Sequence, residues 1–180
     1  MAFYFPKLFR HYADILRALR LRHPFQWNFT NSIFPAASFN FGPCVFCLDH
    51  HDHHNLAYGL CHIHSLGRYD PKKGGHLILF DLKLVIEFPP NSSILIPSAT
   101  LRHGNVAISP DEIRLSFTQY CAGGLMRWFR YGFSTYNRMV KQNPRLAKEV
   151  EAERPNRWAV GLQYFSKLTE LVQDRHNVFG

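Results

Sequence analysis

The chain has 180 residues, a length that fits one domain with a sizeable core. Hydrophobic residues make up 46% of it and aromatic residues 15%, which excludes a disordered chain. Its formal net charge of +8 suits a partner that carries phosphates, although such a charge supplies affinity without sequence specificity. No apolar run is long enough to cross a bilayer, so we expect no membrane partner.

The first predicted element is an amphipathic helix over residues 6–21. Its apolar side carries Leu8, Tyr12, Ile15, Leu16 and Leu19, while lysine and arginine lie elsewhere on the helix. A mitochondrial transit peptide has a similar composition, but Asp14 and the lack of serine weaken that interpretation. We therefore predict a surface helix that packs beside the core.

Short strand-like runs alternate with turns from residue 33 to residue 133. The turns are rich in proline and glycine, and Asn91 in one of them suits a left-handed backbone conformation. Seven or eight short strands predict an α+β protein that is mainly β, with a double-stranded β-helix, the jelly roll shared with cupins. The runs cover 37–41, 44–50, 58–65, 76–80, 83–88, 93–97 and 113–120.

A candidate metal site comes from residues near the ends of these strands. His50 and Asp52 are two apart, so in an extended strand their side chains point to the same side, and His103 follows a distant apolar strand. Two imidazoles and one carboxylate are the ligands of mononuclear Fe(II) oxygenases, which leave metal positions open for a co-substrate and O2. We predict His50, Asp52 and His103 as catalytic metal ligands. Asp52 with His54 is the alternative pair; we prefer His50 because the following residues then lead into a turn at Asn55.

The last predicted strand supplies a candidate co-substrate site. Its alternation puts Arg114, Ser116 and Thr118 on one face. A guanidinium binds a carboxylate through two parallel hydrogen bonds, so we predict that Arg114 binds the distal carboxylate of 2-oxoglutarate, helped by the hydroxyl of Ser116. Asn55 and Asn105 each follow a proposed ligand, and we expect their amides to orient ligands or substrate; the alternative is a turn position.

Several motifs resemble the catalytic core of 2-oxoglutarate- and Fe(II)-dependent dioxygenases, namely 74–79 (GGHLIL), 88–97 (FPPNSSILIP), 101–105 (LRHGN) and 114–116 (RLS). A closer resemblance is to the Tet/J-binding-protein-like dioxygenases found in many copies in mushroom-forming fungi. It rests on 39–43 (FNFGP), the spacing His50-x-Asp52-x-x-Asn55, 69–76 (YDPKKGGH) and 116–124 (SFTQYCAGG). The chain departs from the family pattern at Asn91 and in its crowd of histidines at 50, 51, 53 and 54.

This resemblance implies an enzyme that uses Fe(II), 2-oxoglutarate and O2 to oxidise the methyl group of a 5-methylpyrimidine, such as 5-methylcytosine, in DNA. The base would have to leave the stack, and Tyr58 or Tyr120 would hold it. The same resemblance implies an intracellular, nuclear protein. Two alternatives remain open: a catalytically inactive cupin-like or nucleic-acid-binding module, and a dioxygenase acting on a protein or a small molecule. The sequence leaves the oligomeric state open.

The cysteines invite a different metal interpretation. Cys44 and Cys47 have the spacing of zinc ligands, but a second pair is missing and the chain shows no secretory signal, so we expect reduced thiols.

Basic residues cluster at 10–22, 127–130 and 138–148. Such runs are more often solvated faces than nucleic-acid contacts, and we favour the solvated face.

Beyond Pro144, two helices split at Pro155 are predicted, over 146–153 and 159–172. The sequence therefore divides into a helical segment (1–32), a dioxygenase core (33–133) and a C-terminal helical extension (134–180).

Overall fold

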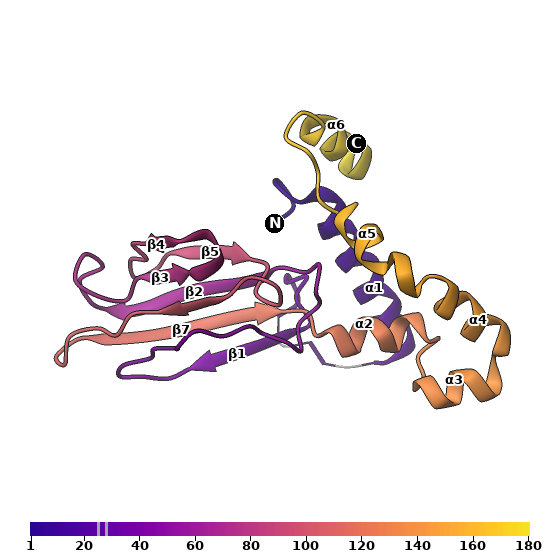
Figure 1. The fold of residues 1–180 in the computed structure, drawn as a ribbon, viewed down its shortest axis with the longest axis horizontal. Helices are drawn as coiled ribbons and strands as arrows, with labels where there is room; N and C mark the ends of the chain where they lie inside the picture. The colour runs from indigo at the N-terminus through magenta and orange to yellow at the C-terminus, as the bar shows by residue number, and fades with distance from the viewer. Residues whose placement is uncertain (25, 28) are drawn as a thin grey trace. The chain divides into compact units, whose positions relative to one another are not determined.

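Seven strands in the middle of the chain form two antiparallel sheets (Figure 1). The computed structural model describes residues 1–24, 26–27 and 29–180. One sheet has the order β1-β7-β2-β5, from β1 (Ala36–Asn40), β2 (Cys61–Arg68), β5 (Ser93–Ile96) and β7 (Ile113–Tyr120). The other has the order β4-β3-β6, from β3 (Leu77–Leu79), β4 (Leu84–Ile86) and β6 (His103–Asn105), with a short 3-10 helix, η1 (Phe80–Leu82), between β3 and β4.

The segment 44–50, predicted to be a strand, forms none. It makes isolated bridges instead, one from Cys44 to Arg114 of β7 and one from His50 to His103 of β6. Because its backbone hydrogen bonds are divided between the two sheets, no continuous ladder develops. The bridge at His50 nevertheless places this segment on the edge of the smaller sheet, beside β6, and completes the strand order of a jelly roll. The predicted double-stranded β-helix is therefore confirmed.

The two sheets enclose the apolar core of this β unit, which spans Phe34–Ala122. Side chains of a strand alternate between its two faces, so Cys61, Ile63 and Ser65 of β2 are buried while His62 and His64 between them are only half-buried. The turn before β5 contains Asn91 with a φ of 66°, the left-handed conformation that the sequence predicted. The core cluster consists of Cys61, Ile63, Leu77, Leu79, Phe88 and Ile96.

The second unit is helical and combines the two ends of the chain, Met1–Ile33 and Gly123–Gly180. Its first helix confirms the helix predicted over 6–21, and its apolar stripe is buried, with Leu8 and Tyr12 at most 1% exposed. Asn143 ends one helix and caps the next, because its side-chain oxygen accepts a hydrogen bond from the backbone of Leu146 over 3.1 Å. The helices are α1 (Pro6–Arg22), α2 (Gly123–Arg130), α3 (Tyr136–Gln142), α4 (Pro144–Ala152), α5 (Arg157–Leu162) and α6 (Leu171–Phe179), with a 3-10 helix, η2 (Arg154–Asn156), before α5.

The prediction of one continuous helix over 159–172 is wrong. Helix α5 ends at Leu162 and α6 begins at Leu171, and the residues between them form turns, such as Phe165 N–H to the carbonyl of Leu162. The structure also groups the chain differently from the predicted three segments. Helix α2 belongs to the helical unit rather than to the core, and the two terminal segments form one unit. Among the described residues, no helix is long and apolar enough to span a membrane.

Candidate metal centre and co-substrate pocket

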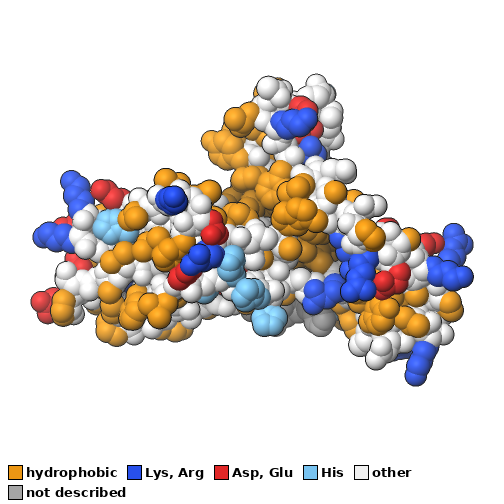
Figure 2. Space-filling view, viewed as in Figure 1, with side chains coloured by type: hydrophobic (Ala, Val, Ile, Leu, Met, Phe, Trp, Pro, Cys, Tyr) orange, Lys and Arg blue, Asp and Glu red, His pale blue; other side chains and the backbone are white. Residues whose placement is uncertain are grey.

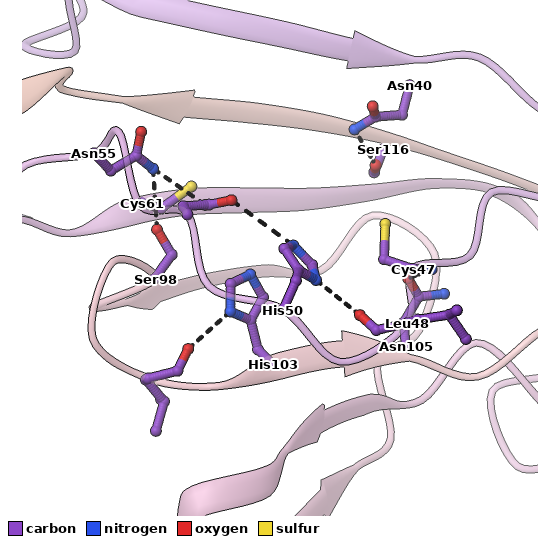
Figure 3. Close-up of polar contacts among 12 residues, drawn as sticks. Asn40, Cys47, Leu48, His50, Asn55, Cys61, Ser98, His103, Asn105 and Ser116 are labelled. Atoms are coloured by element: carbon purple, nitrogen blue, oxygen red, sulfur yellow. Dashed lines mark hydrogen bonds and ion pairs between the residues drawn. The ribbon is translucent and has the colours of Figure 1, made fainter.

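Three side chains meet in the β unit, two from the segment at residues 50–52 and one from β6. His50 lies in the bridge to β6, Asp52 follows it by two residues, and His103 is the first residue of β6. Their possible ligand atoms all lie within 4.8 Å of one another. Figure 3 shows the rings of His50 and His103 next to each other. His50 Nε2 lies 3.7 Å from Asp52 Oδ1, and the centroids of the two imidazoles are 4.3 Å apart. The structure thus brings together the three residues predicted as metal ligands.

Backbone carbonyls orient both imidazoles. Nδ1 of His50 donates to the carbonyl of Leu48 over 2.8 Å, and Nδ1 of His103 donates to the carbonyl of Leu101 over 2.9 Å. A carbonyl only accepts, so each Nδ1 carries the proton, and each Nε2 of a neutral ring keeps its lone pair for a metal. Burial lowers the pKa of His103, which favours the neutral imidazole that a metal requires.

Asp52 is oriented by two neighbours. Its backbone N–H donates to the carbonyl of Ser98 over 2.9 Å. The side-chain amide of Asn55 donates to Asp52 Oδ2 over 3.1 Å and to Ser98 Oγ over the same distance. Oδ1 is left facing His50, as a metal-binding oxygen would be. Of the two roles predicted for Asn55, the structure places its amide on a ligand.

His54, the alternative ligand, is exposed at the rim of the cavity. In the part of the chain that the structure describes, the group of possible metal ligands contains His50 and lacks His54. The reason is tertiary: the bridge between His50 and His103 holds those two rings side by side. Figure 2 shows histidine side chains gathered on the surface of the β unit.

Arg114 and Ser116 lie on β7 with their side chains buried, 2% and 7% exposed. Nη1 of Arg114 donates to the carbonyl of Val45 over 3.0 Å, while its buried Nε has no hydrogen-bond partner. None of the described carboxylates forms an ion pair with this guanidinium. A buried cation with unused donors requires an anion, because burial of an unpaired charge is costly.

Asn40 is a residue that sequence reasoning missed as part of the site. It is the last residue of β1, it pairs with Ser116 in the register of the sheet, and its Nδ2 donates to Ser116 Oγ over 2.9 Å. Ser116 therefore keeps its own O–H free to donate to a carboxylate. The signal that could have found Asn40 is its position in the FNFGP motif, two residues after Ser38 on the same face of a predicted strand.

One cavity of about 460 Å³ contains all these groups. Its volume lies within the range of small-molecule sites, which is roughly 300–1,000 Å³. The three possible metal ligands line it together with Arg114, Ser116 and Asn40. The donor set fits Fe(II), which accepts two histidines and a carboxylate, and the unpaired guanidinium fits the distal carboxylate of 2-oxoglutarate.

Of the residues predicted to contact substrate, some line the cavity and one does not. Tyr120 lines the cavity, with its hydroxyl 3.3 Å from Ser38 Oγ. Tyr58 lies in a turn and is not among the residues that line the cavity. Asn105 also lines it, but its side chain accepts from the backbone of Cys47 and donates to the carbonyl of Val45. These bonds fasten the segment 44–50 to β6.

No cysteine belongs to a group of possible metal ligands among the described residues. Cys44 and Cys47 are exposed free thiols, and in the described chain neither belongs to a group of three possible ligands. Cys61 lines the cavity near Asp52, and its burial raises the pKa of its thiol to about 12, so the thiol is protonated.

Several solved structures resemble this chain, and one of them can be named. No protein-family model matches the chain, and no curated protein matches it. The chain is similar in structure to a viral collagen prolyl hydroxylase from Paramecium Bursaria Chlorella virus-1, solved as a complex with 2OG. That similarity has 14% sequence identity and a TM-score of 0.34, and it covers 61% of this chain and 70% of the viral one. Membership of the fungal Tet/J-binding-protein-like family stays a prediction from the sequence motifs.

Proposed function

We propose that the chain is an Fe(II)- and 2-oxoglutarate-dependent dioxygenase. The observation that carries this proposal is that His50, Asp52 and His103 converge in the same cavity as the buried, unpaired Arg114. In this class of enzyme, iron and 2-oxoglutarate together activate O2 to oxidise a substrate C–H bond. A metal site and an anion site within one cavity are what a chelating dicarboxylate co-substrate needs.

Each residue then has a defined part. The two imidazoles and the Asp52 carboxylate would hold the metal, which would supply open positions for a co-substrate and O2. Arg114 would bind the far carboxylate of 2-oxoglutarate, and the hydroxyl of Ser116, oriented by Asn40, would donate to the same carboxylate. Burial of Arg114 would strengthen its ion pair with this carboxylate, because a charge pair is screened less away from water.

For the substrate, we propose the methyl group of a 5-methylpyrimidine in DNA. The proposal is supported by the resemblance of the motifs at 39–43, 69–76 and 116–124 to Tet/J-binding-protein-like dioxygenases, and by the net charge of +8. Tyr120 is the aromatic side chain in the cavity that a flipped base would meet. A nuclear location follows from this substrate and is part of the same proposal.

The test measures succinate formed from 2-oxoglutarate by purified protein with Fe(II) and ascorbate. The parent should form succinate, Asp52→Ala should form none, and His54→Ala should behave as the parent because His54 is an exposed histidine of the same segment. An Asp52→Ala protein as active as the parent would overturn the metal site. Bound iron without succinate formation would point to an inactive binding module instead.

The substrate is tested in the same assay with duplex DNA. Succinate formation should rise with a duplex that contains 5-methylcytosine and stay unchanged with the same duplex unmethylated, and mass spectrometry should find the oxidised base. Succinate formation that depends on Asp52 but does not rise with methylated DNA would overturn the proposal of a DNA substrate. It would leave a dioxygenase acting on a protein or small molecule.

A further inference from the structure

The positive charge of the chain belongs to one of its two units. The helical unit, Met1–Ile33 with Gly123–Gly180, contains fifteen lysines and arginines and six aspartates and glutamates, a net charge of +9. The β unit, Phe34–Ala122, contains six and seven respectively, a net charge of −1. The unit that holds the candidate catalytic site therefore contributes none of the net positive charge.

The acidic residues of the helical unit are already neutralised. Each of its six carboxylates forms an ion pair with a different lysine or arginine of the same unit, for example Asp174 with Lys7 at 3.1 Å and Glu149 with Arg145 at 3.2 Å. Nine basic residues are left without a carboxylate partner among the described residues. They carry the unit's whole net charge, and an external anion can neutralise them.

Some of these nine cations contact neutral groups that leave the charge in place. Arg20 lies over the ring of Trp27 at 4.6 Å, and Arg175 lies over Phe3 at 4.0 Å. Others, such as Arg127 of α2, Lys141 of α3 and Lys148 of α4, are exposed. Figure 2 shows lysine and arginine side chains at several places over this unit, with hydrophobic side chains between them.

We infer, against the solvated face that the sequence favoured for these basic clusters, that the helical unit is a docking surface for the phosphate backbone of duplex DNA. Phosphates match a surplus of cations that have no internal carboxylate partner. Seven of these nine cations are arginines, whose planar guanidinium binds phosphate through two hydrogen bonds, which favours nucleic acid over a diffuse charge effect. The inference concerns a part of the chain outside the candidate catalytic site, and its choice of duplex DNA among nucleic acids rests on the proposed function.

The experiment compares two triple variants of the full chain that remove the same charge. One changes the helical unit (Arg127→Gln, Lys141→Gln, Lys148→Gln), and the other changes exposed residues of the β unit (Arg68→Gln, Lys72→Gln, Lys83→Gln). Each loses one arginine and two lysines. Binding of a short fluorescent, unmethylated duplex is followed by anisotropy from about 0.05 to 0.2 M salt, without iron or 2-oxoglutarate.

The helical variant should bind about tenfold more weakly, and the slope of log affinity against log salt should fall by about one for each lost phosphate contact. The β-unit variant should change by less than about twofold. Equal losses in the two variants, or no loss in either, overturn the inference. So does parent protein that binds vesicles containing phosphatidylserine but no duplex.

Two further proteins separate loss of charge from loss of structure. A charge-retaining variant (Arg127→Lys, Lys141→Arg, Lys148→Arg) should bind as the parent does. Arg22→Gln, a single exposed change at the end of α1, should lower the salt slope by about one without altering the circular dichroism spectrum. Because the assay contains no iron and no co-substrate, its failure would leave the proposed oxygenase untouched, and an inactive oxygenase would leave this binding untouched.

Discussion

The side-chain amide of Asn55 donates a hydrogen bond to Oδ2 of Asp52 over 3.1 Å, while Oδ1 of the same carboxylate lies 3.7 Å from Nε2 of His50. One oxygen of the carboxylate is thus held by the protein, and the other faces the histidine with which it would share a metal. Ser98 completes the arrangement, because it accepts the second amide hydrogen of Asn55 and binds the backbone N–H of Asp52.

The first prediction concerns this support. Asn55→Ala should weaken Fe(II) binding about 10- to 100-fold, the usual effect of removing a group that orients a metal ligand. Titration of the protein with Fe(II) under anaerobic conditions measures it. His54→Ala is the matched control, since His54 lies one residue away but does not contact the carboxylate, and it should bind iron as the parent does. Unchanged affinity in Asn55→Ala would contradict the role of this amide.

Arg114→Lys should raise the KM for 2-oxoglutarate by about tenfold or more, because a lysine cannot make the two parallel hydrogen bonds of a guanidinium. Fe(II) affinity should stay the same, since Arg114 is not one of the predicted metal ligands. The dependence of succinate formation on 2-oxoglutarate concentration measures the KM. Arg68→Lys, an exposed change on β2, is the control and should leave the KM unaltered. A parent-like KM in Arg114→Lys would mean that the co-substrate binds elsewhere.

The effects of Asn40 and Ser116 on 2-oxoglutarate binding should be coupled. Asn40→Ala and Ser116→Ala should each raise the KM for 2-oxoglutarate by roughly 2- to 10-fold, the effect of one hydrogen bond. The double variant should show less than the product of the two effects, because Asn40 acts by orienting the hydroxyl of Ser116. A double-mutant cycle on KM provides the measurement. Strictly multiplicative effects would show that the two side chains work independently.

A pH dependence is expected from the helical unit. Burial lowers the pKa of His11 to about 4, below its value of about 6.5 in an unfolded chain. The unfolded state therefore binds more protons between these values, and the free energy of unfolding falls as the pH drops from about 6.5 towards 4. Since His11 is partly exposed, solvent screening limits the loss to the order of 1 kcal/mol.

Urea unfolding of the helical signal at pH 7 and at pH 5 measures this loss. His11→Phe is the matched control, because a phenyl ring can keep the stacking on Tyr164, where the ring centroids are 4.0 Å apart, but cannot take up a proton. Its stability should vary less over this range. A variant as sensitive to pH as the parent would assign the effect to another group.

The core of the β unit provides a stability prediction. Leu79→Ala should lower the free energy of unfolding by about 2–5 kcal/mol, because the side chain is 5% exposed and lies within the core cluster. Leu82→Ala, three residues away and 56% exposed, should change it by less than about 0.5 kcal/mol. Thermal unfolding followed by circular dichroism compares the two. Similar losses in both variants would be inconsistent with the packing described above.

Local periodicity accounts for the predictions that the structure confirms. A side chain's face follows directly from its position in a strand or helix, so the apolar stripe of α1 and the common face of Arg114 and Ser116 could be read from spacing alone. The same alternation, punctuated by turns, was enough to predict the jelly roll. The helix over 159–172 failed because apolar spacing does not show where a chain turns between two helices.

Long-range contacts decided the rest, since spacing along the chain carries no information on which strand lies beside which. Whether His50 or His54 joins Asp52 depended on the bridge between His50 and His103, and the part played by Asn40 depended on the pairing of β1 with β7. The net charge was visible in the sequence from the start. The sequence also shows where the basic clusters lie, but only the fold shows that they belong to one unit, because folding, not sequence order, determines which charges are neighbours.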